Sequence, residues 1–76
     1  LSRQFKKELG MGITEFINKR RIEEAKFLMI QGMGSITDIA ISVGFESYNY
    51  FYRVFKKMTS ITPKDFIKQY GKSSQG

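Results

Sequence analysis

The stretch of this 76-residue chain that is most informative about function is 35–58, and the side chains in it that could contact nucleic acid lie between Ser47 and Lys57. Asn49 carries an amide that both donates and accepts, and Arg53 carries a planar guanidinium with five donors. An amide matches the adenine edge in the DNA major groove, and a guanidinium matches the guanine edge. Lys56 and Lys57 carry ammonium groups, which suit phosphate oxygens. The stretch therefore has the chemistry needed to contact duplex DNA.

Catalytic and metal-binding chemistry have few candidates in this sequence. The chain contains no histidine and no cysteine, which excludes histidine bases, reactive thiols and thiolate metal ligands. The adjacent carboxylates Glu23 and Glu24 point about 100° apart on a helix. We expect them to be solvated or paired with Arg20, Arg21 or Lys26. The sequence predicts no enzymatic activity, no metal site and no cofactor in this segment.

The charge of the chain favours an anionic partner. Thirteen Lys and Arg residues against seven Asp and Glu leave a formal net charge of +6, and the isoelectric point is near 9.8. Nucleic acid and an acidic membrane both suit such a charge, and a merely solvated basic surface also explains it. No apolar run approaches the roughly 18 residues of a membrane span. We expect no membrane partner and, because cysteine is absent, a cytoplasmic location.

Two short helices joined by a glycine turn are predicted to position the polar groups. Apolar residues recur at i, i+3, i+4 and i+7 in two successive sets, Ile36, Ile39, Ala40 and Val43, and then Phe51, Val54, Phe55 and Met58. This spacing places each set on one side of a helix. Gly44 lies between the sets and supplies the permissive backbone of a tight turn. The pattern is typical of a helix-turn-helix.

The polar residues of the second helix project away from its apolar side. At about 100° per residue, the outer face carries Asn49, Arg53 and Lys56, with Tyr50 and Lys57 on one flank and Tyr52 on the other. Competing structural roles remain open for two of these residues. Arg53 could instead form a salt bridge with Glu46 or Asp38, and Asn49 could only support the helix cap.

A long helix is predicted before this unit and a shorter helix after it. The long helix covers 13–31, with Ile13, Ile17, Ala25 and Leu28 on one side, Ile22 and Met29 extending the arc, and glycines at 32 and 34 after its end. Ser35 and Ser47 are predicted N-caps. Thr62 followed by Pro63 is a start signal for the last helix.

The chain also resembles itself at an offset of 50 residues. Segments 1–17 and 51–67 share six identities, Arg3/Arg53, Phe5/Phe55, Lys6/Lys56, Lys7/Lys57, Phe16/Phe66 and Ile17/Ile67. The repeat predicts that residues 1–12 are the remnant of an earlier recognition helix. The first helix and turn of that earlier unit would precede Leu1.

Together, these motifs resemble the AraC/XylS class of bacterial transcription regulators. The resemblance rests on I-x-x-I-A-x-x-x-G-F-x-S-x-x-Y-F-x-R-x-F-K-K at 36–57, T-P-x-x-F at 62–66 and R-x-x-E-A-x-x-L at 21–28. It implies two helix-turn-helix subdomains joined by a long helix, with recognition helices in successive major-groove segments. The chain departs from the class at Ser60, Gly12 and Ile67, where glycine, a capping serine and arginine are frequent.

The resemblance also implies residue roles. By position, base contacts are expected from Tyr48, Asn49, Tyr50 and Arg53, and from Ser2 and Arg3 in the remnant. Phosphate contacts are expected from Ser47, Tyr52, Lys56, Lys57, Lys6 and Lys7. Tyr48 projects toward the apolar side of its helix, so packing competes with a base contact at that position.

The sequence as a whole predicts an all-α DNA-binding domain of a bacterial AraC-like transcription regulator, with helix 47–58 reading the major groove of double-stranded DNA. We expect a recognition-helix remnant at 1–12, a linker helix at 13–31, a complete helix-turn-helix subdomain at 32–70 and a flexible tail at 71–76. RNA polymerase is considered as a second partner, and an effector-binding or dimerisation domain is expected outside these residues. The alternatives are a protein-docking module with a Tyr48/Tyr50/Tyr52 patch and an appendage of an enzyme.

Overall fold

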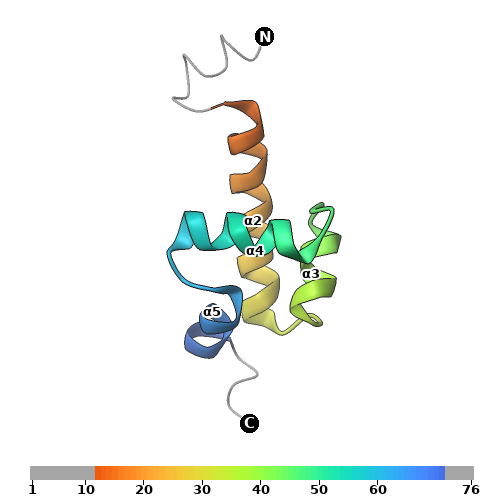
Figure 1. The fold of residues 1–76 in the computed structure, drawn as a ribbon. Coiled ribbons are helices and arrows are strands. Elements are labelled where there is room, and N and C mark those ends of the chain that lie inside the picture. The colour runs from red at the N-terminus through yellow and green to blue at the C-terminus, as the bar shows by residue number, and fades with distance from the viewer. Residues whose placement is uncertain (1–11, 72–76) are drawn as a thin grey trace.

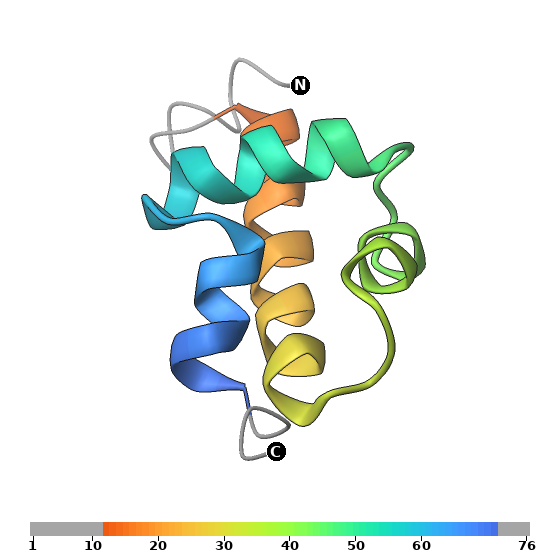
Figure 2. The same cartoon turned by 60° about the horizontal axis from the view of Figure 1, so that its bottom comes forward.

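The computed structural model describes residues 12–71, which form four helices around one small core (Figure 1). The helices are α2 (Ile13–Gln31), α3 (Ile36–Ser42), α4 (Tyr48–Thr59) and α5 (Pro63–Tyr70). Helix α4 crosses α2, and α3 and α5 lie on either side of the C-terminal half of α2 (Figures 1 and 2). The all-α prediction is confirmed. The linker role of α2 and the division at residues 12, 31 and 70 stay predictions.

Side-chain caps begin three of the helices at the predicted residues. The Ser35 hydroxyl accepts from the Asp38 amide at 3.1 Å and begins α3. The Thr62 hydroxyl does the same for α5, accepting from the Asp65 amide at 3.1 Å. Each cap satisfies a first-turn amide that has no partner within its helix. Gly12 begins α2 without a side-chain cap, as its departure from the AraC/XylS pattern implies.

Gly44 makes the turn between α3 and α4, and its backbone requires glycine. Its φ is +113°, a region that residues with a Cβ rarely adopt. A Cβ at this position would also lie 2.8 Å from Nε of Arg21. The Arg21 guanidinium lies over the ring of Phe45, 5.8 Å from its centroid. The turn is therefore packed directly against α2.

Aromatic side chains of α4 occupy the centre of the core. Phe51 and Phe55 are both 0% exposed, and their ring centroids are 5.5 Å apart. They are surrounded by buried apolar residues from every helix of residues 12–71, namely Ile22, Ala25, Met29, Ile39, Ala40, Val43, Phe45, Val54 and Phe66. Burial of an apolar side removes nonpolar area from water, which is what holds a helix to its neighbours. The predicted apolar side of the second helix is the buried side of α4 at Phe51, Val54 and Phe55.

The buried side of α2 agrees with the predicted apolar arc at Ile22, Ala25 and Met29 and differs from it at two positions. Ile13 and Ile17, predicted on the same side, are 39% and 40% exposed. The buried residues of this helix are Asn18, Ile22, Ala25 and Met29. The other three helices pack on this side, so it is their contacts that select the buried stripe. Met58 was also assigned to a core stripe and is 36% exposed, because it borders a groove beside α4.

Candidate nucleic-acid interface

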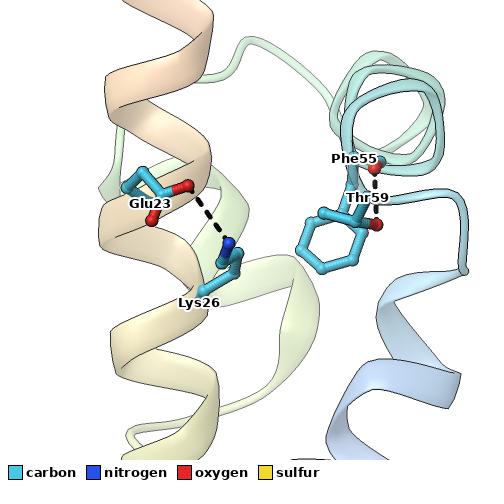
Figure 3. Close-up of polar contacts among 4 residues, drawn as sticks. All are labelled: Glu23, Lys26, Phe55 and Thr59. Atoms are coloured by element: carbon cyan, nitrogen blue, oxygen red, sulfur yellow. Dashed lines mark hydrogen bonds and ion pairs between the residues drawn. The ribbon is translucent and has the colours of Figure 1, made fainter.

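Helix α4 presents a polar outer face to solvent. Asn49, Arg53, Lys56 and Lys57 are all exposed, as the projection predicted. The Ser47 hydroxyl accepts from the Tyr50 amide at 3.2 Å and begins the helix. At the other end, the Thr59 hydroxyl donates to the Phe55 carbonyl at 2.8 Å (Figure 3). The face is thus carried by a helix that is capped at its start and anchored in the core.

The structural roles that competed with DNA contact for Arg53 and Asn49 are not seen in residues 12–71. The side-chain ion pair in this part of the chain joins Lys26 to Glu23 at 3.1 Å within α2 (Figure 3), and Arg53 pairs with neither Glu46 nor Asp38. Asn49 makes no side-chain hydrogen bond there, because Ser47 supplies the cap. Within residues 12–71, neither competing role is therefore filled by these two side chains.

An open groove of about 1000 Å³ runs between α2 and α4. Four cationic side chains border it, Lys19 and Lys26 from α2 and Arg53 and Lys57 from α4. Glu15 and Glu23 border it as well, and Glu23 is paired with Lys26. The groove is net positive, so it continues the basic character of the outer face of α4.

The phenol of Tyr50 is turned toward α2 rather than to solvent, and the base contact expected from this residue stays a prediction. Tyr50 is half-buried, and its hydroxyl accepts a hydrogen bond from Nδ2 of Asn18 in α2 at 2.9 Å. Its ring meets the ring of Phe45 edge-on, with centroids 5.7 Å apart. The helical projection placed Tyr50 correctly on a flank of α4. That flank faces α2, which the projection of one helix cannot show.

The three tyrosines of α4 do not form one patch. Tyr48 and Tyr52 are neighbours, with ring centroids 6.0 Å apart, and Tyr52 is 36% exposed. Tyr48 is half-buried and also packs on the Phe51 ring at 6.2 Å. Tyr50 is turned toward α2 and Phe45. An aromatic docking surface made from all three rings therefore has no support in this arrangement.

Some sequence predictions fall outside the described residues, and some structural contributors were missed. Ser2, Arg3, Lys6 and Lys7 lie outside residues 12–71, as does the predicted tail beyond Gly71. Sequence analysis missed Asn18, which is 8% exposed. Its signal was a polar residue four positions before Ile22 and seven before Ala25, in phase with the buried stripe.

Neither a metal site nor a membrane span is found in the described part of the chain. Residues 12–71 contain no cluster of three or more acidic, histidine or cysteine side chains able to hold a metal ion. No helix in this range is long and apolar enough to cross a bilayer.

Fold and surface together define a helix-turn-helix domain, and comparison with known proteins identifies its family. A family profile described as a helix-turn-helix domain matches residues 1–69. An uncharacterised HTH-type transcriptional regulator of Staphylococcus aureus is 44% identical over 66 residues, covering 87% of this chain and 9% of the relative. The xylose operon regulatory protein of Escherichia coli is 39% identical, with coverage of 87% and 17%.

Two solved structures share the fold. The C-terminal domain of the two-component response regulator YesN from Fusobacterium nucleatum matches with a TM-score of 0.81 and 40% identity, over 88% of this chain and 65% of that one. The xylose-binding transcription activator XylR matches with a TM-score of 0.76 and 35% identity, over 93% and 19%. The chain belongs to the AraC/XylS family and is a DNA-binding domain of an AraC-like bacterial transcription regulator.

Proposed function

We propose that α4 enters the major groove of duplex DNA and that Asn49 and Arg53 contact base edges there. The observation that carries this proposal is the state of Arg53, which is exposed on the outer face of α4 without an ion-pair partner in residues 12–71. A guanidinium with free donors suits the two acceptors on the guanine edge. The amide of Asn49, four residues earlier on the same face, suits adenine.

Phosphate contacts are assigned to the residues around these two. Lys56 and Lys57 lie one turn after Arg53, and both are exposed. The Ser47 hydroxyl accepts from the Tyr50 amide and retains its own proton, which a phosphate oxygen can accept. Tyr52 is exposed beside Tyr48 and can donate in the same way. Such contacts fix the register of a helix on DNA without reading sequence.

Tyr48 and Tyr50 are assigned a smaller share of the base contacts than the resemblance implied. The Tyr48 ring is partly taken up by Phe51, and the Tyr50 hydroxyl is bonded to Asn18. Ser2 and Arg3 keep the proposed role that the 50-residue repeat implies for them. Their contacts would lie in a second segment of the major groove.

The properties of the whole protein are a further part of the proposal. This chain spans 9% and 17% of the two curated relatives, so an effector-binding or dimerisation domain is proposed outside it. We propose that the DNA-binding domain itself has no catalytic activity, because the chain lacks histidine and cysteine. We also propose a cytoplasmic location, because a regulator that binds chromosomal DNA must be in the same compartment, and RNA polymerase as a second partner there.

The experiment is a titration of the chain with a randomised DNA duplex at several salt concentrations. About three to five phosphate contacts predict a log–log slope of roughly −2.7 to −4.5, at about −0.9 per phosphate. One complete motif covers little groove, so we expect an affinity closer to micromolar than nanomolar. A docking module would bind weakly and respond little to salt. Absence of binding even at low salt would refute the proposal.

A further inference from the structure

One hydrogen bond joins α2 directly to the recognition helix. Nδ2 of Asn18 donates to the Tyr50 hydroxyl at 2.9 Å, across 32 residues of sequence. Within residues 12–71 it is the one hydrogen bond between side chains of different helices. Asn18 is also the buried polar side chain of this part of the chain, at 8% exposure. A buried polar side chain lowers the stability of the fold unless it makes a hydrogen bond.

The bond adds a directional restraint to the apolar packing that holds α4. Phe51 and Phe55 hold α4 in the core, but apolar contacts have little directional preference. A hydrogen bond restricts both distance and angle. The Asn18 bond therefore opposes rotation of α4 about its own axis and fixes the start of the helix against α2.

Rotation of α4 would move the proposed base contacts directly. Tyr50 lies between Asn49 and Arg53 in the sequence, one residue from the first and three from the second. At the 5 to 6 Å outer radius of a helix, a rotation of about 10° displaces a side-chain atom by roughly 1 Å. A bidentate base contact requires both donors within hydrogen-bond range, so this displacement is enough to weaken it.

We propose that Asn18 is a positioning residue for sequence reading, which acts through Tyr50 on the angle of α4 and makes no contact with DNA itself. This inference rests on the proposed function of α4. It also means that the half-buried Tyr50 hydroxyl acts through its hydrogen bond to Asn18 and not through a contact with a base. The specificity of the recognition helix is then set in part by a residue of the preceding helix.

The test uses single and paired variants of the chain that break the bond from either end. Asn18→Ala removes the donor, and Tyr50→Phe removes the acceptor but keeps the ring against Phe45. The probes are a duplex selected by the parent chain from a randomised pool and a scrambled duplex of the same composition. The quantity measured is the affinity ratio between the two duplexes. Circular dichroism confirms that each variant is folded at the assay temperature.

In both single variants the affinity ratio should fall at least about fivefold, which is the lower end of the discrimination that one bidentate base contact supplies. Both variants should lose sequence preference at the same base positions. The affinity ratio of the double variant should fall no further than that of either single variant, because the same bond is removed in all three. The salt slope on the scrambled duplex should not change, since the phosphate contacts remain. Met29→Leu, at another buried position of α2, should keep the parent ratio.

A conservative variant keeps the proposal testable if Asn18→Ala fails to fold. Asn18→Asp has nearly the same size, and its carboxylate can accept from the Tyr50 hydroxyl, so the link is kept with the donor reversed. Its added negative charge weakens both duplexes alike and leaves their ratio close to that of the parent. Asn18→Leu has a similar size and no hydrogen-bonding group, so it breaks the bond without leaving a cavity. Loss of the ratio in Asn18→Leu together with its retention in Asn18→Asp supports the proposal, whereas retention in both overturns it.

Three outcomes would overturn it, and they point to different faults. A ratio reduced in Tyr50→Phe but not in Asn18→Ala means that Tyr50 touches DNA itself. A ratio unchanged in every variant means that the Asn18 bond serves stability alone. If the parent chain binds neither the randomised pool nor the scrambled duplex, the proposed function of α4 fails, and the positioning role fails with it.

Discussion

Truncation of Phe55 should remove most of the stability of the domain. The ring is 0% exposed and contacts Phe51 and Phe66, with both centroid distances 5.5 Å. Truncating a buried Phe to Ala costs about 3 to 5 kcal/mol, because transfer energy is lost and a cavity remains. At about 0.05 to 0.15 kcal/mol per residue, a chain of this length has roughly 4 to 11 kcal/mol in total. Phe55→Ala should therefore be unfolded or only marginally folded at room temperature.

Thermal unfolding followed by circular dichroism measures this effect. At about 4 to 8 °C per kcal/mol for a domain of this size, the midpoint should fall by more than about 12 °C, or the cooperative transition should vanish. Phe27→Ala is the matched control, because Phe27 is 60% exposed on α2. Its free energy of unfolding should stay within about 0.5 kcal/mol of the parent.

A cooperative melt of Phe55→Ala within a few degrees of the parent would refute the reasoning. It would mean that Phe55 is not in the core and that the phase of α4 is wrong. The assignment of Asn49 and Arg53 to the outer face would fall with it, because both sides of the helix are set by the same phase.

Three further predictions concern the turns and the outer face. Ser60 ends α4 with φ at 72°, so Ser60→Gly should relieve left-handed strain and stabilise the domain by about 0.5 to 1 kcal/mol in a urea titration; a lower midpoint would contradict this. Gly44→Ala should lower the free energy of unfolding by about 1 to 3 kcal/mol in the same assay, because φ is +113° and the new Cβ would displace Arg21. A midpoint equal to that of the parent would show that the turn adapts. Arg53→Ala, made in the whole protein, should reduce the preference at one base pair by about 1 to 3 kcal/mol. Lys57→Ala should instead weaken binding to all duplexes alike and lower the salt slope by about 1. Selection from a randomised pool and salt titration measure these two effects, and equal weakening of all sequences by Arg53→Ala would make Arg53 an anchor.

The helices and their caps could be predicted because they depend on residues close together in the sequence. The predicted range 13–31 agrees with α2, and the hydroxyls of Ser35, Ser47 and Thr62 each accept from an amide three residues later. The left-handed residue at Ser60 falls where the AraC/XylS pattern usually has glycine. A cap or a turn is formed within about four residues, so the local sequence contains all of its partners.

The exposed face of α4 was predictable for a related reason. Its apolar side is continuous, with Phe51, Val54 and Phe55 all buried, so the opposite side had to carry the polar residues. The sequence of the long helix does not identify one buried side in the same way. Apolar residues surround much of α2, and Ile13 and Ile17 are as apolar as Ile22, which is 2% exposed.

The amino-acid sequence by itself therefore determined the helices, their ends, the outward position of Asn49 and Arg53, and the family. Only the tertiary structure decided which side of α2 is buried, that Tyr50 turns to Asn18, and that a basic groove lies between α2 and α4. The physical reason is range. Helical periodicity and capping are short-range properties, whereas the burial of a flank depends on which neighbouring helix crosses it, and the Asn18 bond joins residues 32 positions apart.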